Sequence, residues 1–162
     1  MRSLVAQPIT REAFAPFGDI IDFGKGSDFA INNGMCDRFH YLAECEAVGE
    51  DAKTIISLGR ARKYDVPLTL NMMERHPFGS QAFVPLEPYR LLVVVAPDDN
   101  GKPGEPVPFV TEPGQGVNYR RNVWHSVLTP FEKQSDFLIV DRHGVENNLE
   151  EYFFEEAFSV SI

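Results

Sequence analysis

Short runs of apolar, β-branched and aromatic residues, separated by proline- and glycine-containing segments, recur along the whole chain. Runs of this kind between turn signals are typical of the strands of an all-β sandwich or barrel. The sequence predicts strands over residues 19–23, 28–32, 39–42, 54–60, 64–74, 79–84, 90–95, 107–111, 116–119, 124–128 and 135–141. We expect these strands to pair mainly as antiparallel neighbours in a barrel.

Three segments depart from this pattern. Thr10 can cap a short helix over residues 11–14, which a following proline and glycine would end. Residues 96–106 are rich in Pro, Asp and Gly and predict an exposed turn between two strands. Residues 148–162 are ambiguous, because their first half has apolar residues at helical spacing whereas residues 157–162 alternate like a strand.

Length, composition and charge limit the classes of protein to which this chain can belong. With 162 residues, 43% of them hydrophobic, the chain can bury a sizeable core, and we expect one domain over residues 1–162. The formal net charge of −9 disfavours nucleic acid and anionic membrane surfaces as partners. The longest apolar run, residues 91–96, is far below the roughly 20 residues of a membrane span, and no leader-like segment opens the chain, so we expect a cytoplasmic protein. Cys36 and Cys45 are spaced unlike paired metal ligands and are expected to be buried thiols.

Candidate chemistry centres on the histidines, because the sequence contains no nucleotide fingerprint, phosphate loop or nucleophile elbow. Glu74 and His76 are two residues apart and would project from the same face of a strand. Gln81 follows a Pro-Phe-Gly turn and could return to that face on a hairpin, while His125 lies on another strand after a polar turn. Two imidazoles, a carboxylate and an amide oxygen could hold one divalent cation and leave positions open for water or substrate.

Each of these residues also has a structural interpretation. A histidine beside a proline, as at His76, is common in turns, and His125 alone is no more specific. Glu74 could pair with a neighbouring arginine on a solvated sheet face, an interaction worth about 0 to 1 kcal/mol. Residues assigned to core, surface or structural roles are Trp124, His40 and His143.

Residues 74–81 resemble a variant of the first cupin motif, in which two histidines two residues apart are followed by a glutamate. Glu74 stands where the first histidine would be, and Gln81 where the glutamate would be. Residues 114–125 resemble the second cupin motif. Asn122 replaces its glycine, and asparagine tolerates the left-handed backbone that such a turn needs.

A longer resemblance is to the ureidoglycolate lyase family, carried by residues 74–86 (ERHPFGSQAFVPL) and 113–125 (PGQGVNYRRNVWH). It extends over nearly the whole chain, including residues 16–18 and 92–97. It implies a cupin-type, jelly-roll-like β-barrel, commonly a homodimer, that splits (S)-ureidoglycolate into glyoxylate and urea in allantoin and purine breakdown. It also implies a divalent metal, nickel first, with manganese, iron or zinc as alternatives. Some members have a second histidine where this chain has Ser126.

The resemblance and the chemistry of the substrate suggest roles for individual residues. The metal would be held by His76, Gln81 and His125, and Glu74 would be a fourth ligand or the general base. An arginine fork is expected at the substrate carboxylate, with the candidates Arg121 first, Arg75 second, and Arg120. Further candidates are Asn118 for substrate binding and Lys63 for proton transfer.

Two other functions stay open at this point. Hydrolysis of the same substrate would release ammonia and carbon dioxide with glyoxylate, and would begin in the same pocket. A cupin barrel can also serve as a non-catalytic sensor of a small acid, although the sequence shows no DNA-binding helix to support a regulator.

Overall fold

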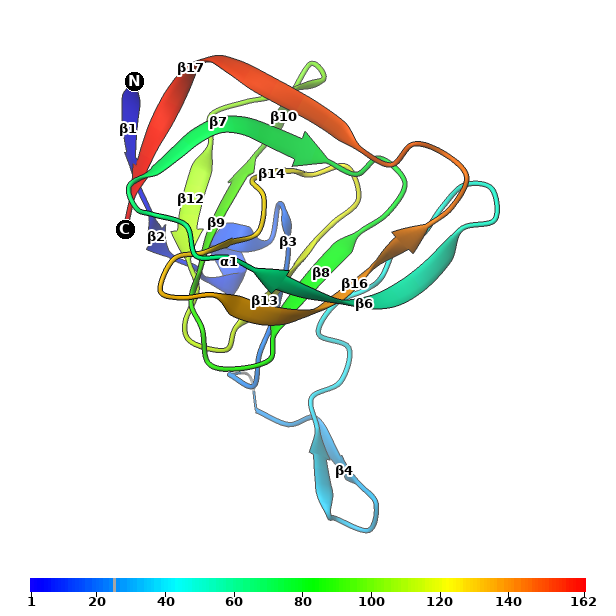
Figure 1. The fold of residues 1–162 in the computed structure, drawn as a ribbon. Helices are drawn as coiled ribbons and strands as arrows, with labels where there is room; N and C mark the ends of the chain where they lie inside the picture. The colour runs from blue at the N-terminus through cyan, green and yellow to red at the C-terminus, as the bar shows by residue number, and fades with distance from the viewer. Residues whose placement is uncertain (25) are drawn as a thin grey trace.

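The computed structural model describes residues 1–24 and 26–162, and its regular structure is almost entirely β-strand (Figure 1). The strands are β1 (Arg2–Val5), β2 (Gln7–Pro8), β3 (Gly18–Ile21), β4 (Phe29–Ile31), β5 (Cys36–Arg38), β6 (Lys53–Ala61), β7 (Leu68–Arg75), β8 (Gln81–Pro85), β9 (Leu91–Ala96), β10 (Asp98–Asp99), β11 (Lys102–Pro103), β12 (Val107–Val110), β13 (Gly116–Tyr119), β14 (Trp124–His125), β15 (Thr129–Pro130), β16 (Ser135–His143) and β17 (Glu150–Ser161). Helix α1 (Arg11–Phe14) begins after Thr10, whose hydroxyl accepts a hydrogen bond from the Ala13 N–H, which confirms the predicted cap.

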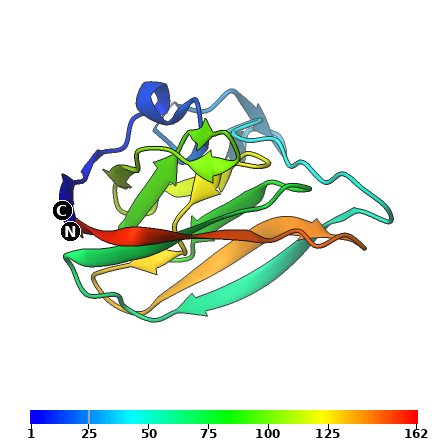
Figure 2. The same ribbon diagram turned by 90° about the horizontal axis from the view of Figure 1, so that it is seen from above.

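Two sheets build the barrel. The larger has the order β1–β17–β7–β14–β9–β12–β2, with β15 also paired to β9, and the smaller has the order β3–β13–β8–β16–β6. Because only Ala6 separates β1 from β2 in the chain, the two ends of the larger sheet are joined and the sheet is nearly closed. Figure 2 shows β17 and β7 side by side along one edge of the molecule. The predicted cupin-type β-barrel is confirmed.

Strand β9 lies between two hydrophobic cores, because both of its faces are buried. Leu91, Val93 and Val95 pack in one core with side chains of the smaller sheet, such as Phe83 and Phe137. The alternate residues of β9 pack in the second core, which is made of Leu68, Leu70, Met73, Leu92, Val94, Ala96, Trp124, Phe131, Phe158 and Val160. Burial on both faces explains the continuous apolar run of this strand. Strand β14 pairs with β9 on one side and β7 on the other, and so lies in the middle of the larger sheet.

Most predicted strands are present with shifted ends, but some predictions were wrong. Residues 39–42 form no strand, β7 begins only at Leu68, and β14 ends at His125. The ambiguous C-terminal segment is the strand β17. Its irregular spacing of apolar residues matches a shift of register against β7 between Phe153 and Phe158.

The expectation of buried thiols was also wrong, because Cys36 and Cys45 are both exposed. Cys36 lies on the β4–β5 hairpin, which extends away from the barrel (Figure 1).

Trp124 is 2% exposed and lies in the second core, as predicted. The predicted turn after β9 is a small hairpin of β10 and β11. Among the described residues, no helix has the length and apolar character required to cross a bilayer.

Candidate metal centre

Glu74, His76 and His125 meet where β7 ends. Glu74 is near the end of β7, His76 follows that strand, and His125 pairs directly opposite Glu74 from the neighbouring β14. One possible ligand atom of each residue lies within 4.8 Å of those of the other two. The centroids of the two imidazole rings are 5.2 Å apart. The structure therefore brings together three side chains that come from two separate sequence motifs.

An irregularity in the pairing of β7 with β17 turns Glu74 toward this group. Leu70 and Met73 are three residues apart, yet both pack in the second core. The shift of register in β17 lies opposite this part of β7. In an uninterrupted strand residue 74 would face the same core as Leu70. After the irregularity, Glu74 instead lies on the face opposite Met73, beside the histidine of β14.

Backbone carbonyls fix both imidazole rings. Nδ1 of His76 lies 2.7 Å from the carbonyl oxygen of Asn148, and Nδ1 of His125 lies 2.9 Å from that of Ser126. Because a carbonyl oxygen only accepts hydrogen bonds, each Nδ1 carries a proton, and in the neutral form of each ring Nε2 has a lone pair. Both Nε2 atoms are buried and lack a hydrogen-bond partner among the described residues. Metal-binding histidines commonly donate their other N–H in this way, so the two rings fit a divalent ion.

Gln81 faces the same interior from the smaller sheet. It is the first residue of β8 and pairs opposite Tyr119, whose ring stacks on His125. Its Nε2 donates a 3.3 Å hydrogen bond to Oδ2 of Asp141. Its Oε1 is buried and has no partner within the described chain. The free oxygen is the atom of this amide that can bind a cation, so Gln81 also fits the donor set of a metal.

Burial decides the electrostatics of the group. Desolvation raises the pKa of Glu74 above its ordinary value, and His76 opposes this rise. Desolvation, reinforced by His76, lowers the pKa of His125 to about 3. His125 is therefore neutral at physiological pH, which is the protonation state that a metal ligand needs. A divalent cation would compensate the negative charge of the Glu74 carboxylate, which is half-buried beside these rings.

The three candidate arginines are placed differently. Nη1 of Arg121 lies 3.5 Å from the carbonyl oxygen of Pro77, next to His76, and its side chain is 45% exposed. Its contact with Glu46 is loose, with 3.7 Å between Nε and the carboxylate. Arg121 is thus the candidate arginine that lies beside the His76 loop with few fixed contacts.

The structure does not bring Arg75 to the metal group. Its guanidinium donates hydrogen bonds to Glu150 at 2.6 Å and to Asp98 at 2.7 Å. It also lies 4.5 Å from the ring centroid of Trp124. Because Trp124 belongs to the second core, Arg75 lies on the opposite face of β7 from Glu74.

Asn118 and Arg120 lie on the outer face of the smaller sheet. They alternate with Tyr119, which faces the interior. Asn118 Nδ2 donates hydrogen bonds to Asp19 Oδ2 and to the carbonyl oxygen of Glu44, and Arg120 also pairs with Asp19. Neither residue is brought to the Glu-His-His group.

Lys63 lies toward the other end of the barrel. It follows the end of β6 at which Ala61 pairs with Ser135, whereas Asp141, the partner of Gln81, pairs with Ile55 near the opposite end. Its ammonium lies 4.0 Å from Asp65. The structure gives Lys63 no contact with the candidate centre.

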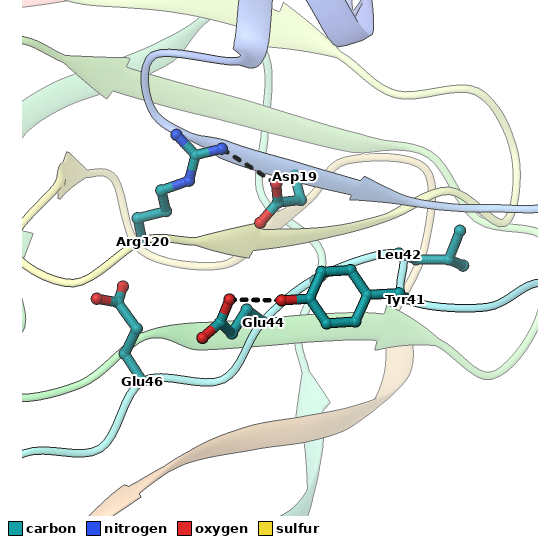
Figure 3. Close-up of a pocket in the computed structure, with 7 residues that line it drawn as sticks. Asp19, Tyr41, Leu42, Glu44, Glu46 and Arg120 are labelled. Atoms are coloured by element: carbon teal, nitrogen blue, oxygen red, sulfur yellow. Dashed lines mark hydrogen bonds and ion pairs between the residues drawn. The ribbon is translucent and has the colours of Figure 1, made fainter.

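A cavity of about 490 Å³ lies on the outer face, under the segment that follows the β4–β5 hairpin. Figure 3 shows that the Arg120 and Asp19 side chains point toward each other across one side of it, and Tyr41 toward Glu44 on another. The segment is joined to the sheet by Asn118, whose Nδ2 donates a hydrogen bond to the carbonyl oxygen of Glu44. None of the lining residues belongs to the Glu-His-His group.

Sequence reasoning missed several residues that shape the centre. Tyr119 is buried and stacks on His125, and Asp141 orients the amide of Gln81. The alternation of Val117 and Tyr119 with polar neighbours is a sequence signal for Tyr119 facing inward. The carbonyl of Asn148 has no such signal, because a backbone acceptor is not specified by residue type.

Fold and site together define a cupin-type β-barrel with a candidate metal centre of one glutamate and two histidines. A family model described as Ureidoglycolate lyase matches residues 1–161, and the chain belongs to this family. It is 56% identical over 162 residues to a ureidoglycolate lyase of a Chelativorans species, covering 100% of this chain and 98% of that protein. It is 54% identical over 162 residues to a ureidoglycolate lyase of Mesorhizobium japonicum, with 100% and 99% covered. Ureidoglycolate lyase 2 of Rhizobium meliloti is 52% identical over 160 residues, with 99% and 98% covered.

Proposed function

We propose that this chain is a ureidoglycolate lyase that splits (S)-ureidoglycolate into glyoxylate and urea. The observation that carries the proposal is the meeting of Glu74, His76 and His125 inside the barrel of a chain that the family matches almost from end to end. Full-length relatives at 52% to 56% identity that are named ureidoglycolate lyases support the same substrate.

The reaction requires one proton to leave the substrate hydroxyl and one to reach the ureido nitrogen. The C–O bond becomes the carbonyl of glyoxylate, and the electrons of the breaking C–N bond go to the nitrogen, which leaves as urea. A proton carrier between the two atoms can serve both steps. We assign this role to the Glu74 carboxylate, because it lies beside both imidazoles and is half-buried.

His76 and His125 through Nε2, and Gln81 through Oε1, would hold the metal. When bound, such an ion lowers the pKa of a hydroxyl and stabilises the developing oxyanion. Tyr119 and the carbonyls of Asn148 and Ser126 hold the rings in the orientation that keeps both lone pairs available. Arg121, with its exposed guanidinium beside the His76 loop, would bind the substrate carboxylate.

Nickel is the proposed ion, supported by the imidazole-rich donor set and by the family resemblance.

A homodimer is also proposed, supported by large exposed apolar side chains such as Ile56, Leu58 and Phe153. Phe158, on the same strand as Phe153, is buried in the second core and does not add to this exposed surface. Light scattering should give about twice the 18.3 kDa of one chain. A cytoplasmic location stays a proposal, to be tested by fractionation of cells that express the chain.

The decisive assay incubates nickel-loaded protein with racemic ureidoglycolate and follows glyoxylate, urea and ammonia together, with a protein-free blank. We expect glyoxylate and urea in equal amounts and consumption of half of the racemate. Ammonia and carbon dioxide in place of urea would identify an amidohydrolase. Binding of the substrate without turnover would identify a sensor, and either result would overturn the proposal.

A further inference from the structure

Arg142 of β16 is a buried guanidinium outside the candidate metal centre. Its side chain is 1% exposed, which is rare for an arginine and requires that its donors be satisfied. Nε donates to the carbonyl oxygen of Val48 at 2.8 Å, and Nη1 to that of Glu146 at 3.4 Å. Nη2 pairs with the Glu146 carboxylate, and the guanidinium carbon lies 5.2 Å from the ring centroid of Phe78. One side chain therefore contacts three loops, which we define as residues 46–50, 76–80 and 144–148.

Glycines in all three loops leave room for this arrangement. A Cβ atom on Gly79 would lie 2.5 Å from Cβ of Arg142, and one on Gly144 would overlap the guanidinium itself. At Gly49 a Cβ would lie 2.5 Å from the Glu146 carboxylate, and its φ of +104° favours glycine independently. The backbone thus packs directly against the arginine and its carboxylate partner.

The same three loops hold the ring of His76. The Asn148 carbonyl accepts the 2.7 Å hydrogen bond from His76 Nδ1, and the Asn148 side-chain oxygen accepts one of 2.7 Å from the Phe78 N–H. The Val48 N–H donates to the Phe78 carbonyl at 2.9 Å. Glu146, two residues before Asn148, also accepts from the Glu50 N–H at 2.7 Å. Each loop is therefore joined both to Arg142 and to the residues that surround His76.

His125 provides an internal contrast. Its Nδ1 is held by the carbonyl of Ser126, the next residue, and not by any of the three loops. Its ring is also stacked on Tyr119. The orientation of His125 should therefore be independent of Arg142.

We propose that Arg142 is a positioning residue that sets the tautomer and direction of the His76 ring by fixing the loop that carries the Asn148 carbonyl. The inference rests on the proposed function only in that His76 is taken as a metal ligand. Without the guanidinium, loop 144–148 keeps its hydrogen bonds from the Glu50 N–H to Glu146 and from the Val145 N–H to the Glu50 carbonyl oxygen, but loses the contacts that fix it to Val48 and Phe78. The Asn148 carbonyl then moves, and His76 Nε2 is no longer held with its lone pair toward the centre.

The test uses full-length, metal-free protein labelled with ¹⁵N, and reads each histidine tautomer from long-range ¹H–¹⁵N spectra. Both His76 and His125 should carry the proton on Nδ1 in the wild type. In Arg142→Gln, His76 should lose this preference while His125 keeps it. Affinity for Co²⁺, added alone and followed by its absorption, should fall by about 10- to 100-fold. Arg142→Lys should recover part of the affinity, since it keeps the charge but cannot reach three acceptors at once.

Arg60→Gln is the matched control, because Arg60 makes an exposed pair with Asp136 and touches none of the three loops. It should leave both readouts unchanged. If Arg142→Gln does not fold, Glu146→Gln keeps a side chain of the same size and should give the same selective change at His76. An unchanged His76 tautomer and cobalt affinity within twofold of wild type in a folded variant would overturn the proposal. Neither readout requires turnover, so failure of the lyase assay would leave this test standing.

Discussion

The phenol ring of Tyr119 lies parallel to the imidazole of His125, with an interplanar angle of 2° and ring centroids 4.2 Å apart. The two residues come from different sheets, Tyr119 from β13 and His125 from β14. The stack therefore links the smaller sheet to the candidate metal centre of the larger one. It holds the ring at a position where a shift of about 1 Å would weaken metal binding.

We predict that Tyr119→Phe, which keeps the stacked ring, changes the free energy of unfolding by less than about 1 kcal/mol. Tyr119→Leu removes the aromatic surface from a buried site and should cost on the order of 2 kcal/mol. Urea unfolding of both variants measures the difference. Equal stability of the two variants would show that the stack contributes nothing.

Replacement of either histidine by alanine should remove the bound metal, because the remaining donors form an incomplete site. His143, which is exposed on β16, gives the control His143→Ala, whose metal content should equal that of wild type. Metal analysis after gel filtration checks both, and cooperative thermal unfolding shows that the variants are folded. Full metal content in the double variant His76→Ala/His125→Ala would exclude this centre.

Glu74→Gln separates the two roles of the carboxylate. If Glu74 carries the proton, as proposed, the variant keeps its metal while kcat falls by about 100-fold or more. Loss of metal from the variant would instead make Glu74 a ligand. Turnover close to that of wild type would exclude both roles.

Metal-free protein should become less stable as the pH falls from about 6.5 toward 3, in part because of His125. Burial lowers the pKa of this histidine to about 3 in the folded state, so the unfolded chain binds its proton first. The stability that neutral, buried His125 contributes to the folded state is present in full above pH 6.5 and is lost as the pH falls. Urea unfolding at pH 7.5 and 4.5 gives the free energy of unfolding of wild type and of His125→Gln. The free energy of wild type minus that of the variant should be smaller at pH 4.5 than at pH 7.5. A difference that is constant with pH would contradict the burial argument.

Much of the candidate centre was predictable from local spacing, and the rest depends on long-range pairing. Glu74 and His76 are two residues apart, so their common side followed from the period of a strand. The register that sets His125 opposite Glu74 joins strands about 50 residues apart in the chain, and no local pattern fixes such a pairing. Asn118 was assigned to the substrate site, yet it faces outward, because the core alternation of β13 places Tyr119 inside.

The same physical distinction applies to the arginines. Arg75 lies between Glu74 and His76 in sequence, but it alternates with Glu74 on β7 and faces the other side of the strand, where it pairs with Asp98 and Glu150. We predict that Arg121→Ala raises KM by about 10- to 150-fold, corresponding to a charge-assisted contact of about 1.5 to 3 kcal/mol. Arg121→Lys should restore part of this loss. Arg75→Ala should leave KM unchanged, and a rise in KM with Arg75→Ala but not with Arg121→Ala would reverse the assignment.

The most direct test of the central claim is a titration of metal-free protein with Ni²⁺ while glyoxylate and urea are measured on the same samples. The account predicts negligible turnover without metal, a linear rise to a plateau at one ion per chain, and no rise in His76→Ala/His125→Ala. Full release of glyoxylate and urea by metal-free wild-type protein, or the same titration curve in the double variant, would contradict it.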